Sequence, residues 1–240
     1  MNVVFLSPHF PPNFYNFCVN LKEQGARVHG IADEHYDNLR PELRACLSEY
    51  YRVNDMHNYD ELVRAMGYFT HRSGKIDRID SQNEYWLETE ARLRTDFNIR
   101  GIRMDRINQI KRKSEMKQVF IDAGLKPARG RVCRDEKEVR AFIKEVGFPV
   151  VGKPDVGVGA AKTYKISNEV DLKEYLADKP ETDYIFEEFI SSQIVTFDGL
   201  TDRDGKLVFS ASHYYDKGVM DAVNKDTDIY YYGTRDIEKS

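Results

Sequence analysis

Residues 129–190 alternate short apolar runs with amphipathic segments in an order that few folds accommodate. The pattern predicts strands at 129–133, 149–154, 162–166 and 184–190. Asp135 and Glu138 form a capping-box pattern that opens a helix, and Gly147 ends it. A second helix, with apolar residues from Val170 to Leu176, stands before the last strand. The resulting order, β-α-β-β-α-β, is that of a split βαβ unit.

In the first hundred residues, predicted strands alternate with predicted helices, which is typical of an open, mostly parallel α/β layer. Strands are predicted at 3–6, 27–32, 50–53 and 76–80, and helices at 13–24, 59–70 and 84–97. Gly25 follows the first helix, where glycine is preferred. No G-x-G-x-x-G follows the first strand, where residues 7–12 read SPHFPP. A Rossmann-type dinucleotide site needs those glycines, so this class is disfavoured.

Composition excludes two classes of partner. The net charge of the 240 residues is −4 and the charges are interspersed, so no nucleic-acid surface is indicated. The longest apolar runs are far shorter than the roughly 20 residues of a membrane span. Three widely scattered cysteines, Cys18, Cys46 and Cys133, fit neither a disulfide framework nor a zinc site. We therefore expect free thiols in a reducing cytoplasm.

A glycine-bearing loop between two predicted strands is the central chemical feature. Lys153 enters it, and Gly157 and Gly159 lie within it. Glycines there let backbone N–H groups point at phosphate oxygens, and the lysine adds a positive charge. The alternative is an ordinary hairpin loop beside a surface lysine, and a single G-x-G does not discriminate between the two.

Two further features stand around this loop. Lys113 lies 40 residues before Lys153, at the start of a predicted helix over 114–123. Glu187 and Glu188 end the last strand of the split βαβ unit. They could form a solvated strand face. Beside a phosphate-binding loop, the strand's backbone edge could instead pair with an adenine ring and a carboxylate could accept from its amino group.

Together these features resemble the ATP-grasp superfamily, particularly its carbamoyl-phosphate-synthase-like and carboxylate–amine ligase members. The features that carry the resemblance are the opening α/β layer, Lys113, the helix ending G-L-x-P at 124–127, and the runs 148–166 and 186–190. The fold class it implies is α/β, with a pre-ATP-grasp Rossmann-like parallel-sheet domain at 1–112. An ATP-grasp α+β lid at 113–190 and an incomplete ATP-grasp core at 191–240 would follow.

The resemblance also implies roles for particular residues. Lys113 and Lys153 would bind ATP phosphates, and the mobile loop covering them would contain Gly157, Val158, Gly159 and Ala160. Glu187 would approach the adenine amino group, and Glu188 and Ile190 would meet the adenine edge mainly through their backbones. The family usually has a glutamate for the ribose hydroxyls a few residues later. Gln193 stands there instead and leaves the ribose contact open.

Family members hold magnesium with a carboxylate on one C-terminal strand and a Glu-x-Asn on the next. No Glu-x-Asn follows Ile190, and the acids after it are expected in hairpins and loops rather than in a metal cage. They include Asp198, Asp202, Asp204, Asp221, Asp226, Asp228, Asp236 and Glu238. We therefore expect a chain cut off before its Mg²⁺ ligands, as a truncated piece or a shortened gene, and inactive alone.

The C-terminal segment predicts a hairpin over 194–213 that turns at Asp202 to Gly205. Tyr230, Tyr231 and Tyr232 follow near the end, where they could clamp a ligand or be disordered. Exposed strand edges in this region can also pair two copies into a homodimer.

The function that the resemblance implies is carboxylate activation. ATP would phosphorylate a small carboxylate, and an amine or similar nucleophile would attack the acyl phosphate. The pattern assigns no catalytic residue. The alternative is a nucleotide-binding or regulatory module without turnover.

Overall fold

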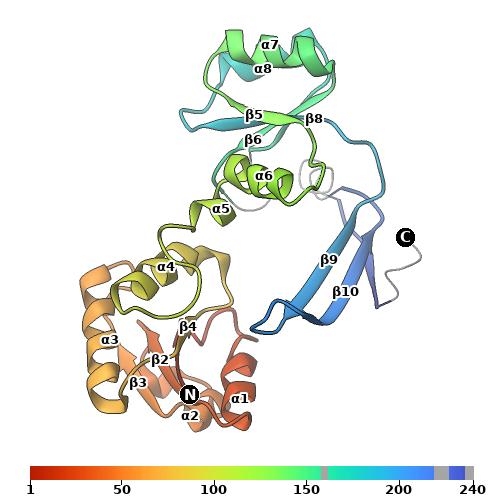
Figure 1. Cartoon of the computed structure of the whole chain (residues 1–240). Helices are drawn as coiled ribbons and strands as arrows, with labels where there is room; N and C mark the ends of the chain where they lie inside the picture. Colours follow the sequence, from red (N-terminus) through yellow and green to blue (C-terminus); the bar gives the residue numbers. More distant parts are fainter. Residues whose placement is uncertain (158–161, 219–226, 236–240) are drawn as a thin grey trace. The chain divides into compact units, whose positions relative to one another are not determined.

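The computed structural model describes residues 1–157, 162–218 and 227–235. The chain divides into two compact units, Met1–Ile110 and Lys111–Ser240 (Figure 1). The division falls two residues before the predicted boundary at 112. The three-domain division at 112 and 190 stays a prediction.

The first unit is built on a parallel sheet in the order β3-β2-β1-β4. Its strands are β1 (Asn2–Leu6), β2 (Arg27–Ala32), β3 (Glu49–Arg52) and β4 (Arg78–Asp80). Its helices are α1 (Tyr15–Glu23), η1 (Tyr36–Asn38), α2 (Pro41–Cys46), α3 (Tyr59–Ser73), η2 (Glu84–Trp86) and α4 (Leu87–Asp96). The predicted parallel α/β layer is confirmed. The predicted helix over 84–97 begins as the 3₁₀ turn η2.

Both faces of this sheet are covered. Val3 and Phe5 pack with Cys18 of α1 and residues of α2, whereas Val4 and Leu6 pack with residues of α3 and α4. Successive side chains of a strand point to opposite faces, so this alternation puts helices on both sides. A strand buried on both faces needs an unbroken apolar run, which explains the sequence of β1.

The division between the units falls within α5 (Asn108–Lys111), whose last residue belongs to the second unit. The helix α6 (Lys113–Asp122) follows in that unit. An antiparallel sheet in the order β5-β8-β6-β7 follows. Its elements are β5 (Gly130–Cys133), α7 (Glu136–Val146), β6 (Val150–Pro154), β7 (Tyr164–Ile166), α8 (Glu169–Ala177) and β8 (Tyr184–Glu188). The chain order is the predicted β-α-β-β-α-β. Figure 1 shows α7 and α8 together on one face of the sheet.

The helix α7 begins with half of the predicted capping box. The side chain of Asp135 accepts from the backbone amide of Glu138 at 2.8 Å. The Glu138 carboxylate accepts from the amide of Arg134 at 2.7 Å rather than from that of Asp135. The helix packs Val139, Phe142 and Ile143 into the core shared with α8 and β8.

The last strands form a small antiparallel sheet in the order β11-β10-β9. They are β9 (Val195–Thr201), β10 (Leu207–Tyr215) and β11 (Tyr231–Thr234). The predicted hairpin is confirmed, with Gly205 at φ +82° in its turn. The alternative that the tyrosine run is disordered is wrong for Tyr231 and Tyr232. Both lie in β11, and the ring of Tyr232 stacks on Tyr214 with centroids 5.2 Å apart.

Cys18, Cys46 and Cys133 are all free and buried. In the three described ranges, no helix is both long enough and apolar enough to cross a membrane.

Candidate functional site

Lys153 and Glu187 share one face of the β5–β8 sheet. In the register of β6 and β8, Val151 lies opposite Glu187 and Lys153 lies opposite Ile185. Phe186 points into the core with α7 and α8, so the alternating residues point to the other face. There the ammonium of Lys153 lies 2.5 Å from Oε2 of Glu187. Residues predicted from distant motifs are thus brought into direct contact.

A third side chain, Lys117 of α6, completes this cluster. Its ammonium lies 2.9 Å from Oε1 of Glu187 and donates to the carbonyl of Ala128 at 2.5 Å. Burial alone would raise the pKa of Glu187, but Lys153 and Lys117 outweigh it and the pKa of that carboxyl is lowered. The sequence reasoning missed Lys117. Its position four residues after Lys113, on the same helix face, is the signal that could have found it.

Lys113 contacts the start of the glycine-bearing loop. Its ammonium donates to the carbonyl oxygens of Pro154 at 2.9 Å and Gly157 at 3.0 Å. Gly157 has φ +142°, in the region that favours glycine. The other predicted loop residues, Val158, Gly159 and Ala160, lie outside the described residues.

Asp155, between these residues, is another group that sequence reasoning missed. It is 1% exposed, and its carboxylate lies 3.2 Å from a guanidinium nitrogen of Arg112 and accepts from Ser114. A buried carboxylate needs such partners. Asp155 thus fixes the loop's first residue against the first turn of α6.

The residues predicted to meet the adenine edge through their backbones lie at and just after the end of β8: Glu188 is its last residue, and Ile190 follows two residues later. The Glu188 carboxylate accepts from the backbone amide of Arg129 at 2.7 Å and from Nε of the same residue at 2.7 Å. These bonds and neighbouring Arg129 lower the pKa of Glu188. The amide of Glu188 donates to the carbonyl of Arg129 at 2.9 Å. The amide of Ile190 makes no backbone hydrogen bond within the described parts of the chain.

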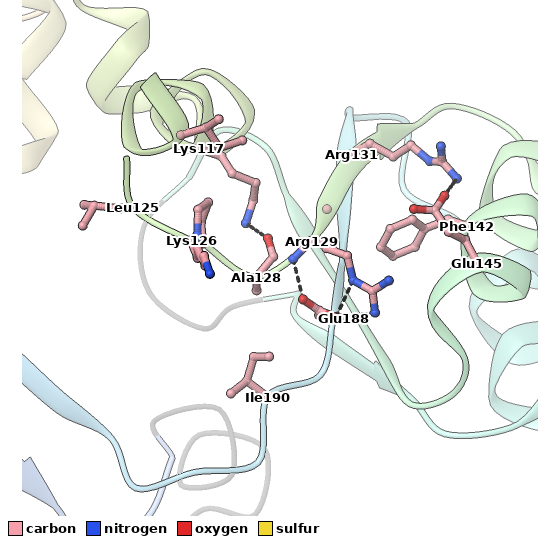
Figure 2. A pocket seen from close by; sticks show the side chains of 13 residues that line it. Lys117, Leu125, Lys126, Ala128, Arg129, Arg131, Phe142, Glu145, Glu188 and Ile190 are labelled. Carbon is pink, nitrogen blue, oxygen red and sulfur yellow. Dashed lines mark hydrogen bonds and ion pairs between the residues drawn. The ribbon is translucent and has the colours of Figure 1, made fainter. Parts of the chain in front are cut away.

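A pocket of about 820 Å³ opens beside this strand end (Figure 2). Its wall includes Lys117, Ala128, Arg129, Glu188 and Ile190, and its far side includes Arg131, Phe142 and Glu145. Figure 2 shows Glu188 held by Arg129 and Lys117 reaching Ala128. The volume lies in the range of roughly 300–1,000 Å³ typical of small-ligand sites.

The pocket therefore brings together two of the predicted site residues, Glu188 and Ile190. Lys153 and Glu187 are joined to its wall through Lys117. Gln193 is exposed, in the segment between β8 and β9. None of these placements tests the predicted ligand contacts, which stay predictions.

Among the residues with described positions, no group of three or more His, Cys, Asp and Glu side chains is arranged to hold a metal ion. Asp198 lies 3.0 Å from His213, and Asp202 accepts from amides in its own hairpin turn. Asp221, Asp226, Asp236 and Glu238 lie outside the described residues.

Comparison with known proteins gives relatives by sequence. No family model matches the chain. The carbamoyl phosphate synthase large chain of Corynebacterium glutamicum is 26% identical over 193 residues, which cover 72% of this chain and 16% of that protein. The chain thus spans about a sixth of the length of this relative.

Solved structures show the same fold. The N5-carboxyaminoimidazole synthetase of Staphylococcus aureus, complexed with ADP, superposes with a TM-score of 0.70 at 14% identity, covering 91% of this chain and 56% of that one. The biotin carboxylase domain of the 2-oxoglutarate carboxylase of Hydrogenobacter thermophilus, complexed with MgADP, ADP and bicarbonate, superposes with a TM-score of 0.66 at 17% identity. It covers 98% of this chain and 64% of that one.

These similarities confirm the resemblance to the ATP-grasp superfamily. The chain is similar in sequence to carbamoyl phosphate synthase large chains, and in fold to an N5-carboxyaminoimidazole synthetase and a biotin carboxylase domain.

Proposed function

We propose that this chain forms the ATP-binding portion of a ligase that activates a small carboxylate as an acyl phosphate, for attack by an amine or similar nucleophile. The observation that carries the proposal is that Glu188 and Ile190 line one pocket with Lys117, and that Lys153 is linked to Lys117 through the carboxylate of Glu187. One end of such a site offers positive charge to phosphates, and the other offers a backbone edge to a planar base.

The backbone at the end of β8 suits adenine. In a regular antiparallel ladder, the backbone amide of Arg129 would donate to the backbone carbonyl of Glu188. Here it donates to the side-chain carboxylate of Glu188 instead. In the proposed complex, the Glu188 carbonyl accepts from the adenine amino group and the Ile190 amide donates to a ring nitrogen. Gln193 is proposed for a ribose hydroxyl, and the Glu187 side chain is proposed to approach the adenine amino group.

The phosphate end depends on two lysines. Lys153 and Lys113 would neutralise phosphate charge, and the segment from Gly157 to Ala160 would cover the phosphates with backbone donors. Bound ATP supplies the γ-phosphoryl group that turns a carboxylate oxygen into a leaving group. We assign no step to a metal ion.

The remaining expectations belong to the same proposal. The three free buried thiols suit a reducing cytoplasm. The partners are ATP and a small carboxylate, and a homodimer is proposed from the exposed edges of the β9–β11 sheet.

Calorimetry with ATP and GTP tests the site. ATP should bind at least tenfold more tightly than GTP, because guanine carries the exocyclic acceptor O6 in place of the amino group and this oxygen would face the Glu188 carbonyl. Lys153→Met should weaken ATP binding about 10- to 100-fold, since hydrogen bonds to charged groups contribute about 1.5–3 kcal/mol. Lys173→Met, on the exposed side of α8, is the matched control. Equal binding of both nucleotides, or equal effects of the two variants, would contradict the proposal.

A second measurement separates the ligase from its alternative. Phosphate release with Mg-ATP is followed in the presence of a panel of carboxylates. Carboxylate-dependent release supports the ligase. Since this portion is expected to be inactive alone, carboxylate binding to the ATP-loaded chain is also measured by calorimetry. The portion of a ligase should bind a carboxylate there, and a nucleotide-binding module without turnover should bind none.

A further inference from the structure

Lys117 is a largely but not fully buried lysine to which the proposed nucleotide contacts give no role. Its side chain is 11% exposed, and its ammonium is shared between Oε1 of Glu187 and the carbonyl of Ala128. Removing an ammonium group from water is costly unless it is paired. Both partners belong to the site: Glu187 contacts Lys153, and Ala128 lines the pocket.

A glycine in β5 leaves space for the Lys117 side chain. Gly130 of β5 lies opposite Glu187 of β8. A Cβ atom at Gly130 would lie 2.8 Å from Cγ of Glu187 and 3.3 Å from Cε of Lys117. Any larger residue would occupy the space where the two side chains meet. The glycine therefore allows a side chain from α6 to reach a carboxylate on the second strand of the sheet.

The cluster holds two ammonium groups and one carboxylate. The ammonium of Lys153 forms an ion pair with Oε2 of Glu187, and the ammonium of Lys117 forms one with Oε1. The residue of β5 that faces Glu187 is the uncharged Gly130, and the nearby Arg129 is engaged by Glu188. Over the described part of the chain, the charged groups that face Glu187 are thus Lys117 of α6 and Lys153 of β6.

In the proposed function, phosphate binding by Lys153 would leave the carboxylate of Glu187 without one of its two partners. To bind a nucleotide phosphate, Lys153 must weaken its contact with Glu187, whose side chain is only 14% exposed. A carboxylate left unpaired at such a position is strongly unfavourable. Lys117 remains on the other oxygen and does not need to move.

We propose that Lys117 is a positioning residue of the nucleotide site, which keeps Glu187 ionised and fixed while Lys153 exchanges this carboxylate for a nucleotide phosphate. The inference rests on the proposed function. It predicts that without Lys117 the carboxylate and the phosphate compete for Lys153.

The test compares ATP binding by Lys117→Met, Lys117→Arg and the unmodified chain from pH 5.5 to pH 8. Each affinity is divided by that of the unmodified chain at the same pH, which cancels the titration of ATP itself. Lys117→Met should bind about tenfold or more weakly at pH 8. The deficit should shrink as the pH falls, because protonation of Glu187 releases Lys153. Lys117→Arg should restore most of the affinity, and Lys173→Met should change nothing.

A second measurement needs no nucleotide. The side-chain carboxyl of Glu187 is titrated by carbon-13 NMR, with its signal assigned from Glu187→Gln. In Lys117→Met its pKa should be higher than in the unmodified chain, because one of its two counter-charges is gone.

The outcomes separate the two proposals. A deficit that is equal at all pH values, or an unchanged pKa of Glu187 in Lys117→Met, overturns the positioning role and leaves the ATP site standing. An unmodified chain that binds no ATP overturns the proposed function, and the role of Lys117 with it.

Discussion

The carboxylate of Asp155 accepts two hydrogen bonds from Ser114, one from the backbone amide at 2.8 Å and one from the hydroxyl at 2.9 Å. Ser114 follows Lys113 directly, and Asp155 stands two residues after Lys153. One pair of side chains therefore ties together the two segments that carry the proposed phosphate lysines. The amide of Lys113 also donates to the Asp155 carbonyl at 2.9 Å.

Asp155→Ala should loosen the first turn of α6. The substitution leaves the amide and hydroxyl of Ser114 without their acceptor, which costs about 1–3 kcal/mol. Amide exchange over residues 114–116, followed by mass spectrometry, should accelerate about 5- to 150-fold. Asp155→Asn keeps an acceptor oxygen and should cost less. Equal exchange in Asp155→Ala and the unmodified chain would show that the contact does not hold this turn.

Ile190→Pro should weaken ATP binding far more than Ile190→Ala. The side chain of Ile190 is 58% exposed, so shortening it removes little packing. Proline removes the backbone N–H that is proposed to meet the adenine ring. Calorimetry measures both affinities, and circular dichroism shows whether each variant is folded. Equal affinities in two folded variants would exclude the Ile190 amide as a contact.

The sequence predicts most of the fold because the relevant signals are local. Gly25, Gly124 and Gly147 were expected to end helices, and all three have φ near +80° in the structure. The run from Val3 to Leu6 is buried on both faces, as its unbroken apolar character indicates. Patterns of this kind depend only on the backbone period and on the chemistry of one turn.

The contacts of the candidate site are less visible in the sequence, because they join distant segments. The motifs pointed to Lys153 and Glu187, but their ion pair depends on the register of β6 and β8. Lys117 was missed because its contact with Glu187 depends on how α6 packs against β5 and on the missing side chain of Gly130. Asp155 was read only as part of a loop, although it is almost fully buried.

His29 should make the stability of the first unit depend on pH. Its ring is buried in β2 against Phe69, with centroids 4.8 Å apart, and neither ring nitrogen has a partner among the described residues. Burial lowers the pKa of His29 below its ordinary value. The unfolded chain then takes up a proton below about pH 6.5 and the folded chain does not. The unfolding free energy should therefore fall as the pH drops from 6.5 toward the lowered pKa.

Urea unfolding between pH 5 and pH 8 measures this dependence. Trp86, the one tryptophan of the sequence, is buried in the first unit, so its fluorescence reports the unfolding of that unit. His29→Phe keeps an aromatic ring against Phe69 and removes the titrating group. The difference in slope between the two proteins isolates His29, at up to about 1.4 kcal/mol per pH unit. Parallel slopes would show that His29 is protonated equally in both states.

Arg94→Met should destabilise the first unit more than a typical substitution. Arg94 and Glu90 form an ion pair at 2.8 Å with side chains 9% and 2% exposed, and Arg94 also donates to the carbonyl of Ile79 at 2.7 Å. Removing one partner of a buried pair costs about 3–5 kcal/mol, because the other charge is left uncompensated. Burial raises the pKa of Glu90, and the loss of Arg94 should raise it further. Since the folded variant then binds a proton at mildly acidic pH, its deficit should be larger at pH 8 than at pH 5.

Trp86 fluorescence during urea unfolding measures both values. The double variant Glu90→Gln/Arg94→Met removes both charges and should lose less than Arg94→Met alone at pH 8, and a larger loss would mean that Glu90 is not the group left uncompensated.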